Sequence, residues 1–470
     1  MKVLLINPPI LNLIPSMLPK SIDESRGYNP PLGILYLAAY LQKHSTHQVK
    51  ILDCQVEELN YKQIRNIIQK DKPDVVGLTT MTFTLIDVLK IVQLVKEIDT
   101  EIKVVLGGPH VDIYPLETIS QSGVDYLVLG EGERPFKNLL DKINYPKQLY
   151  QIKGIVFKDE KKVINNGRAE FDRDLDSLPF PARSLTPYQK YFSVLSKVHP
   201  VTTMFTSRGC PYKCLFCDRP QLGKIFRARS PKNVVDEMEE CQKMGIKEIL
   251  IYDDTFTVNR QRVLSICQEI MKRELKIGWD IRTRPDTVDT QLLTAMKEAG
   301  CQRIHYGVES GTQKILNVLR KGITLEQIEE TFRLTKKTGL EILAYFMIGS
   351  PTETRENILQ TIKFAKRLNP DFTHITITTP FPATDLYRLG LKQKILPYDY
   401  WQEFAQNPLS TFAPSIWEEH LTKEELFQLL KYAYRSFYLR PHYVFKKLLG
   451  LTSWQEFRNK AEVAWQLLKV

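Results

Sequence analysis

The sequence predicts an α/β protein in three parts: an N-terminal doubly wound, Rossmann-like domain, a six-stranded partial (βα)6 TIM-like barrel, and a helical C-terminal extension. Short Val/Ile/Leu runs alternate with amphipathic stretches over residues 1–145 and again over 201–385, the rhythm of parallel strands covered by helices. Residues 386–470 are rich in aromatics and helical in period. A length of 470 residues allows two or three separate cores.

Five apolar runs predict the strands of the first domain: KVLLI, VKILD, DVVGLT, IKVVLGG and VDYLVLG. Ligands of doubly wound sheets bind beyond the carboxyl ends of the strands, so the residues that follow strands are the binding candidates. These candidates are Asn7, Pro8, Thr79, Thr80, Gly107, Gly108, Glu131, Gly132 and Glu133. The segment INPPILNL after the first run lacks the glycines of G-x-G-x-x-G, so a nicotinamide or flavin dinucleotide is not expected in that mode.

Residues 146–200 are expected to connect the two domains. The stretches IKGIVFKD and KKVINNG can pair as a hairpin, whereas DSLPFPARSLTP contains too many prolines for a helix or a central strand.

Six further runs predict the strands of the second domain: TTMFTS, EILIYD, GWDIRTR, RIHYGVE, LEILAYFMIG and FTHITITTP. Six strand–helix units, rather than eight, favour an open partial barrel. Ser230 and Pro231 predict a helix start, because serine can cap the helix while proline needs no hydrogen bond in the first turn. Gly245 predicts the end of the same helix.

Three cysteines, Cys210, Cys214 and Cys217, follow the first strand of the barrel with the spacing C-x3-C-x2-C. A structural zinc ion normally takes four ligands. An iron–sulfur cubane has four irons, so three thiolates leave one iron open to a ligand with an amine and a carboxylate. The alternative is a zinc site completed by another cysteine. The candidates for that role are Cys241, Cys267 and Cys301, whose positions in helical patterns or beside a strand favour burial in the core.

The segment CPYKCLFC resembles the signature of radical S-adenosylmethionine (SAM) enzymes. The resemblance implies that Cys210, Cys214 and Cys217 bind a 4Fe–4S cluster, that Phe216 packs near the adenine of SAM, and that cleavage of SAM gives a 5'-deoxyadenosyl radical. Residues at the ends of later strands are implied as further SAM contacts. They are Asp253 and Asp254 in YDDTF, Glu309 and Ser310 in GVESG, and Gly349 in FMIGSPTET.

For each of these acidic residues, a helix cap or a salt bridge is the alternative role. Arg282 and Arg284 in DIRTRP either face a carboxylate or neutralise the acids.

The first domain resembles the cobalamin-binding domain often fused ahead of a radical SAM barrel. The matching features are NPP after the first strand, PLGILYLAAYL in the first helix, GGPH and GEGE after the fourth and fifth strands, and LDSLPFPAR in the connector. Many such domains carry D-x-H-x-x-G, whose histidine binds cobalt. Here Asp53 begins that stretch and Gln55 occupies the histidine position, which resembles the subgroup without a lower histidine ligand. His110 in GGPH is expected to be an ordinary loop histidine.

The resemblance covers residues 1 to about 390 and implies a cobalamin-dependent radical SAM enzyme that methylates an unactivated carbon. One SAM would methylate reduced cobalamin and a second would supply the radical. The first alternative is an oxidation, cyclisation or rearrangement without methyl transfer, as in the oxidative ring cyclases of tetrapyrrole biosynthesis. The second is a cobalamin or redox sensor.

Composition limits the partners and the location. The net charge is +11, but the basic residues are scattered and no nucleic-acid module is recognised, so nucleic acid is not expected. The expected partners are a small-molecule or lipid-like substrate and an electron donor such as flavodoxin or ferredoxin. Seven cysteines without a secretion signal, and no apolar run of about 18 to 20 residues, predict a cytoplasmic protein.

The segment YAYRSFYLRPHYVFKKLLG, residues 432–450, interleaves aromatic and basic residues. A helical cap over the barrel is the favoured interpretation. Peripheral contact with an anionic membrane surface is the alternative.

Overall fold

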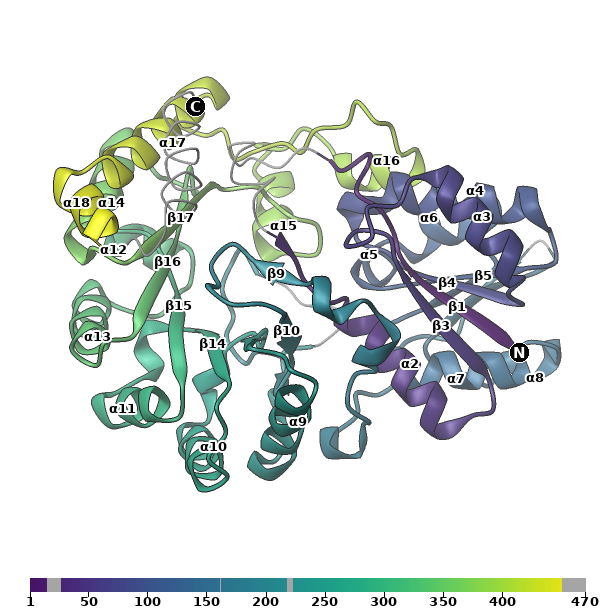
Figure 1. Cartoon of the computed structure of the whole chain (residues 1–470). Helices are drawn as coiled ribbons and strands as arrows, with labels where there is room; N and C mark the ends of the chain where they lie inside the picture. The colour runs from purple at the N-terminus through teal and green to yellow at the C-terminus, as the bar shows by residue number, and fades with distance from the viewer. Residues whose placement is uncertain (15–26, 161, 218–222, 450–470) are drawn as a thin grey trace.

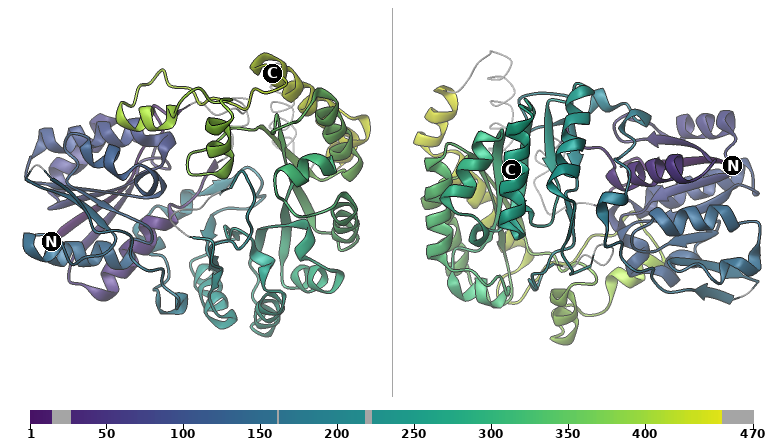
Figure 2. Two further views of the ribbon diagram at one scale, coloured as in Figure 1. Left: turned by 180° about the vertical axis from the view of Figure 1, so that it is seen from behind. Right: turned by 90° about the horizontal axis from the view of Figure 1, so that it is seen from below.

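The structure is a computed structural model that describes residues 1–14, 27–160, 162–217 and 223–449, with side chains described to residue 445. Two α/β units lie side by side, the first domain in purple to blue and the barrel in teal to green (Figure 1). Seen from behind, the chain after the barrel crosses to the first domain and returns (Figure 2).

A seven-stranded sheet in the order β3-β1-β4-β5-β6-β7-β8 forms the centre of the first domain. Its five parallel strands coincide with the five predicted runs. They are β1 (Lys2–Asn7), β3 (Gln48–Asp53), β4 (Val75–Thr79), β5 (Lys103–Gly107) and β6 (Tyr126–Val128). Among these five the strand order reverses between β1 and β4, which is the usual position of a ligand in this fold.

Helices cover both faces of this sheet, as parallel strands require. One face packs against α2 (Leu32–His44), α7 (Glu133–Lys142) and α8 (Pro146–Leu149). The other face packs against α3 (Tyr61–Asp71), α4 (Leu85–Ile98) with η1 (Thr82–Thr84) before it, α5 (Pro109–Ile113) and α6 (Pro115–Ser120).

The predicted hairpin forms, but it belongs to the first domain. Strand β7 (Ile155–Asp159) pairs antiparallel with β6, and β8 (Lys162–Asn165) pairs with β7. Val156 is fully buried in the core of the sheet. The first domain therefore extends beyond the predicted boundary at residue 145, because the apolar face of the hairpin is buried at the edge of the sheet.

The connector that follows contains short helical turns and one small pairing with the first domain. Strand β9 (Phe192–Ser193) pairs antiparallel with β2 (Gly27–Tyr28). The turns are η2 (Leu175–Ser177), η3 (Arg183–Leu185) and η4 (Tyr188–Lys190).

Six parallel strands in the order β10-β13-β14-β15-β16-β17 form the partial barrel. They are β10 (Val201–Met204), β13 (Glu248–Ile251), β14 (Gly278–Thr283), β15 (Cys301–Glu309), β16 (Glu341–Ile348) and β17 (Phe372–Ile377). The outer helices are α9 (Pro231–Lys243), α10 (Arg260–Lys272), α11 (Thr290–Glu298), α12 (Gln313–Val318), α13 (Leu325–Lys337) and α14 (Arg355–Leu368), with turns η5 (Phe256–Val258) and η6 (Pro285–Thr287). The predicted number of strands is confirmed.

The predicted start and end of α9 are confirmed. The side chain of Ser230 accepts a hydrogen bond from the backbone N–H of Asn233, and Pro231 occupies the first turn. Gly245 follows the helix with a φ of 84°.

A short antiparallel pair closes the loop that carries the three cysteines. Strand β11 (Ser207–Arg208) precedes the loop, and β12 (Arg227–Ala228) follows it. Gly209 has a φ of 83°, and a Cβ there would overlap the carbonyl oxygen of Ile225. We call this pair of strands the neck of the cysteine loop.

The C-terminal extension consists of α15 (Asp385–Lys392), α16 (Tyr400–Gln406), α17 (Lys423–Tyr438) and α18 (Pro441–Leu449). Helix α16 packs on α6 of the first domain. Trp401 of α16 is fully buried there, with its ring centroid 6.1 Å from that of Phe83. The extension thus contacts the first domain as well as the barrel (Figure 1).

Helix α17 covers the edge of the barrel sheet at β17, the last strand in the order. The hydroxyl of Tyr434 donates to the carbonyl of Ile375 (3.0 Å) and accepts from its N–H (3.1 Å). Tyr438 makes the same two bonds with Thr373, at 2.7 and 3.0 Å. Tyr434 and Tyr438 therefore cover the edge of the barrel sheet and satisfy its backbone groups, whereas Tyr432 and Phe445 of the same segment are exposed.

Two of the basic residues that suggest contact with a membrane surface are Lys446 and Lys447. Their side chains lie outside the part of the chain whose side chains are described. Within the described ranges, no helix is both long and apolar enough to cross a bilayer.

Candidate functional site

The cysteine loop lies at the carboxyl end of β10, at the mouth of the barrel. Cys210 and Cys214 are half-buried, and Cys217 is exposed. The Sγ atom of Cys210 lies 3.7 Å from the hydroxyl of Thr255, which follows β13. Between the cysteines, the N–H of Leu215 donates to the carbonyl of Leu319 at 2.9 Å. The loop is therefore anchored to segments that follow two other barrel elements.

Two cations face Cys214. Arg284 places Nη1 3.9 Å from the Sγ atom, and its guanidinium is held by both oxygens of Asp286 at 2.9 Å. Burial raises the pKa of the Cys214 thiol, while Lys321 and Arg284 act to lower it. Neighbouring cations favour the thiolate, which is the form that binds iron.

The other cysteines of the barrel are not placed to complete a zinc site. Within residues 1–217 and 223–449, as far as they are described, no three His, Cys, Asp or Glu side chains form a group for a single metal ion. The three remaining candidates for a fourth zinc ligand, Cys241, Cys267 and Cys301, are buried in the apolar core of the barrel. Burial raises the pKa of the first two thiols to about 12.

Asp253 binds the neck of the cysteine loop. Its carboxylate accepts from the N–H groups of Thr206 (2.6 Å) and Ser207 (3.0 Å) and from their hydroxyls (2.5 and 2.6 Å). Both oxygens are used and the residue is 1% exposed, so Asp253 has a structural role here, and its contact with SAM stays a prediction. Asp254, which is half-buried at the same strand end, stays a predicted SAM contact.

Glu309 and Lys321 form a nearly buried ion pair of 2.8 Å beside the cysteine loop. Lys321 Nζ lies 6.0 Å from the centroid of the Phe216 ring. Glu309 therefore lies near the predicted adenine contact, with its charge already paired.

Two other predicted SAM contacts pack against protein. Ser310 is fully buried, with its hydroxyl 3.2 Å from that of Thr361. Gly349 has a φ of 75°, and a Cβ there would lie 2.9 Å from the side chain of Leu426 in α17. The glycine thus makes room for the C-terminal extension, and contacts of these two residues with SAM stay predictions.

A hydrogen-bonded network joins the ends of β1 and β3 to the connector. Asn7 donates to Asp53 at 2.7 Å, and the hydroxyl of Tyr191 donates to the other oxygen of Asp53 at 2.7 Å. Gln55, at the position where related domains carry histidine, donates to the carbonyl of Pro8 at 3.0 Å. The side chain at the histidine position is therefore bonded to the neighbouring loop that follows β1.

The loops after β4 and β5 pack on each other. Gly108 has a φ of 105°, and a Cβ there would lie 3.0 Å from the carbonyl oxygen of Thr80 and 3.4 Å from the hydroxyl of Thr79. At Gly107 a Cβ would make only ordinary contact, 3.6 Å from the carbonyl oxygen of Val128. The need for glycine at 108 thus comes from this packing. Contacts of Thr79, Thr80 and Gly107 with cobalamin stay predictions.

His110 is fully buried, with Nδ1 3.0 Å from the hydroxyl of Thr82. Burial lowers its pKa to about 3, so the ring is neutral. The expectation of a loop histidine is corrected, because His110 lies in the first turn of α5 and its Nε2 is buried without a hydrogen-bond partner.

The GEGE loop of the first domain binds the neck of the cysteine loop. Arg227 donates to both oxygens of Glu131, at 2.8 and 2.9 Å. Arg208 lies 3.0 Å from Glu131 and donates to Glu133 at 2.6 Å. Each of these side chains is 6 to 8% exposed. We call these four residues the neck clasp, and cobalamin contacts of the two glutamates stay predictions beside these ion pairs.

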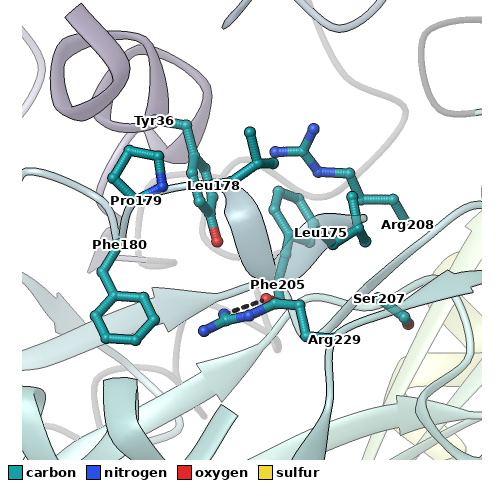
Figure 3. Close-up of a pocket in the computed structure, with 9 residues that line it drawn as sticks. All are labelled: Tyr36, Leu175, Leu178, Pro179, Phe180, Phe205, Ser207, Arg208 and Arg229. Carbon is teal, nitrogen blue, oxygen red and sulfur yellow. Dashed lines mark hydrogen bonds between the residues drawn. The ribbon is translucent and has the colours of Figure 1, made fainter. Parts of the chain in front are cut away.

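Gly132, between these glutamates, packs closely on α2, where a Cβ would lie 3.1 Å from Leu37. Beside the clasp, a cavity of about 10 Å³ lies between Tyr36, the connector and Arg208 (Figure 3). That volume holds about one water molecule, so this part of the junction is packed rather than open to a ligand.

Sequence reasoning missed Arg208, Arg227 and Lys321. Arg208 directly precedes the glycine of the cysteine loop, which is a weak local signal. The other two lie outside the motif, so only the fold reveals their proximity.

Comparison with known proteins agrees with this geometry. A family model for the B12 binding domain matches residues 21–140, and one for the radical SAM superfamily matches residues 204–365. An uncharacterised methyltransferase of Pyrococcus horikoshii is 37% identical over 451 residues, which is 95% of each chain.

Two further matches cover most of the chain. The anaerobic magnesium-protoporphyrin IX monomethyl ester cyclase of Rubrivivax gelatinosus is 29% identical over 430 residues, 90% of this chain and 76% of that protein. The solved structure of the cobalamin-dependent SAM radical enzyme OxsB, with aqua-cobalamin and SAM bound, shares the fold with a TM-score of 0.76 and 20% identity. This match covers 99% of this chain and 72% of the other. The chain belongs to the radical SAM enzymes that carry an N-terminal B12-binding domain.

Proposed function

We propose that this enzyme transfers a methyl group from SAM, by way of cobalamin, to an unactivated carbon of a small-molecule acceptor. When bound, the cluster and SAM supply a radical that removes a hydrogen atom, and cobalamin carries the methyl group. The observation that supports this most directly is the neck clasp, which joins the GEGE loop of the B12-binding domain to the neck of the cysteine loop. Methyl transfer requires both cofactors to face the same substrate.

At the cluster, Cys210, Cys214 and Cys217 would bind iron, and Arg284 and Lys321 would favour the thiolates. Phe216 would pack near the adenine of SAM. Asp254 and Glu309 would contact its amine and ribose. We assign no general base, because a methyl group that reacts with a carbon radical needs none.

In the first domain, the strand ends with Asn7, Pro8, Thr79, Thr80 and Gly107 would receive cobalamin at the point where the strand order reverses. Gln55 leaves the lower face of cobalt without a histidine ligand.

Radical oxidation or cyclisation without methyl transfer is the second candidate. It is favoured by the 29% identity to the cyclase, which extends over 90% of this chain. Both reactions use the same cluster chemistry, so the products decide between them.

The test is anaerobic reconstitution with iron, sulfide and cobalamin, followed by product analysis with SAM that carries a deuterated methyl group. Methyl transfer predicts S-adenosylhomocysteine and 5'-deoxyadenosine in equal amounts, with the label in the product. Product formation with 5'-deoxyadenosine alone would favour the second candidate. A protein without measurable affinity for cobalamin would contradict methyl transfer and leave the radical chemistry standing.

We also propose flavodoxin or ferredoxin as the electron donor, since the cluster must receive single electrons. For the acceptor, a soluble small molecule is favoured over a lipid, because α17 uses its aromatic side chains against β17. The expected location remains the cytoplasm.

A further inference from the structure

The inside of the barrel carries polar side chains one step deeper than the cysteine loop. Four of them are half-buried: Tyr252 at the end of β13, Arg282 in β14, Tyr345 in β16 and His374 in β17. Their neighbours along the chain, such as Ile251 and Ile281, are packed in the outer core. Because side chains alternate along a strand, the four polar residues face the interior of the barrel.

Arg282 lies two residues before Arg284, which reaches Cys214. Two residues along a strand span about 7 Å, so the guanidinium of Arg282 belongs to the layer below the cluster loop. It stacks on the ring of Tyr252 at 3.7 Å and donates to the carbonyl of Ile251 at 3.2 Å. These contacts fix its orientation and leave 28% of its side chain exposed.

The charge of Arg282 is paired only at long range among the described residues. Its nearest carboxylate oxygen belongs to Asp280, 4.0 Å away, which is the outer limit of an ion pair. Asp280 is nearer to His305, at 3.3 Å, and to Arg303, at 3.7 Å. Burial acts to raise the pKa of Asp280, yet His305, Arg282 and Arg303 together hold it below its ordinary value.

Tyr345 does not supply a negative charge to Arg282. Burial raises the pKa of its hydroxyl, so the group keeps its proton, and its oxygen lies 2.9 Å from Nδ1 of His305. Its ring lies edge-on to the ring of His374, with centroids 5.6 Å apart. The surroundings of Arg282 are thus the aromatic ring of Tyr252, hydrogen-bonded neutral groups and one carboxylate, that of Asp280, which it shares with His305 and Arg303.

We propose that Arg282 binds the carboxylate of the acceptor substrate, whose apolar or planar body lies between Tyr252 and Tyr345. A guanidinium with its plane fixed by stacking can form two parallel hydrogen bonds with one carboxylate. A single cation suits a carboxylate better than a phosphate dianion. This inference rests on the proposed function, because it names the class of molecule that the enzyme methylates.

SAM is the other molecule that brings a carboxylate to the barrel. In this family the open iron takes the amine and the carboxylate of SAM at the cysteine loop. Arg282 lies in the deeper layer, so we assign it to the acceptor.

The test uses benzoate as the probe and benzamide as its uncharged match. Binding is measured by saturation-transfer NMR on the cluster- and cobalamin-loaded protein in its oxidised state. The wild type should bind benzoate more tightly than benzamide. Arg282→Gln should lower the affinity for benzoate by at least about tenfold, and Arg282→Lys should lower it less. Arg260→Gln is the control, because Arg260 is an exposed arginine paired with Asp289 on the outer surface.

Equal affinity for the two probes, or an unchanged affinity in Arg282→Gln, would overturn the proposal. Competition of SAM with benzoate, together with tenfold weaker SAM binding in Arg282→Gln, would assign Arg282 to SAM and overturn the acceptor assignment. If inorganic phosphate binds more tightly than benzoate and displaces it, the choice of a carboxylate is overturned. Thermal unfolding of each variant identifies a folding defect. If Arg282→Gln is unfolded, the affinity of Arg282→Lys for benzoate is compared with that of the wild type.

These measurements need no turnover. Failure to detect a methylated product would contradict the proposed function without affecting the binding result. If benzoate binding does not depend on Arg282, methyl transfer still stands as the proposed reaction, with an acceptor of another class.

Discussion

Arg227 of the barrel donates one hydrogen bond to each carboxylate oxygen of Glu131 in the first domain, at 2.8 and 2.9 Å. Arg227 stands directly after the cysteine loop, so this contact links the B12-binding domain to the segment that carries the cluster ligands. Burial acts to raise the pKa of Glu131, but Arg227 and Arg208 hold it below its ordinary value. The stabilisation is therefore present at neutral pH and is lost as the pH falls through the lowered pKa.

Glu131→Gln should lower the free energy of unfolding by about 3 kcal/mol, because it leaves two nearly buried arginines without a full counter-charge. Denaturant unfolding measures this value. Glu101→Gln is the control, since Glu101 is 86% exposed, and it should change stability by less than about 0.5 kcal/mol. Equal effects of the two variants would show that the neck clasp does not stabilise the junction.

Cys214→Ser should abolish the cluster, because the serine hydroxyl does not replace the thiolate between Arg284 and Lys321. Iron and sulfide analysis after reconstitution, with the visible absorbance of the cluster, measures the loss. Cys267→Ala is the matched control, because Cys267 is a buried core residue, and it should keep the iron of the wild type. Retention of iron in the first variant would contradict the assignment.

Glu353→Gln should flatten the pH dependence of stability. Burial raises the pKa of Glu353 from 4.5 to about 7, against hydrogen bonds from the N–H groups of Ser350 and Gly349. A raised carboxyl pKa stabilises the fold at low pH, and this contribution falls by up to about 1.4 kcal/mol per unit as the pH rises from 4.5 to about 7.

The amide of glutamine resembles the protonated acid, so the difference in stability between variant and wild type should grow in favour of the variant from pH 4.5 to about 7 and stay constant above that. Melting temperatures from pH 4 to 9 measure it. Glu356→Gln, on the exposed first turn of α14, serves as the control and should follow the wild-type curve.

Tyr434→Phe should cost about 1 to 2 kcal/mol, because the N–H and the carbonyl of Ile375 lose their partner at the edge of β17. Tyr432→Phe removes a hydroxyl from the same helix at a residue that is 49% exposed, and it should cost less than about 0.5 kcal/mol. Hydrogen exchange at Ile375 should accelerate in the first variant alone. Unchanged protection there would contradict a role in covering the edge.

Gly108→Ala should destabilise the first domain by more than about 1 kcal/mol, because its φ is 105° and its Cβ would lie 3.0 Å from the backbone of Thr80. Gly33→Ala is expected to change stability in the opposite direction, since Gly33 lies in α2 and a Cβ there meets no atom within 4 Å. That variant should gain up to about 1 kcal/mol. Thermal unfolding compares the two, and a stable Gly108→Ala protein would show that the loops can move apart.

The elements that the sequence predicted well are those determined by local pattern. Apolar runs identified the parallel strands, and Ser230 with Pro231 identified the start of α9, because burial and capping act within a few residues. The cysteine loop was identifiable for the same reason, since its spacing is local.

The contacts that the sequence did not predict depend on partners that are distant in sequence. Both oxygens of Asp253 accept from Thr206 and Ser207, which follow the neighbouring strand β10. Gly349 packs against Leu426 of the extension. The periodicity of a chain shows that a residue is buried, but it does not show which distant side chain it contacts.

The first domain is attached to the rest of the molecule at several separate places, among them Glu131 at the neck, Asp53 bonded to Tyr191 of the connector, and the contact with Trp401 of α16. A domain held at several places cannot rotate away about a single hinge without breaking some of these contacts. Acceptor and product must therefore exchange by local displacement of loops, and the spacing between cobalt and iron should stay nearly constant through a catalytic cycle.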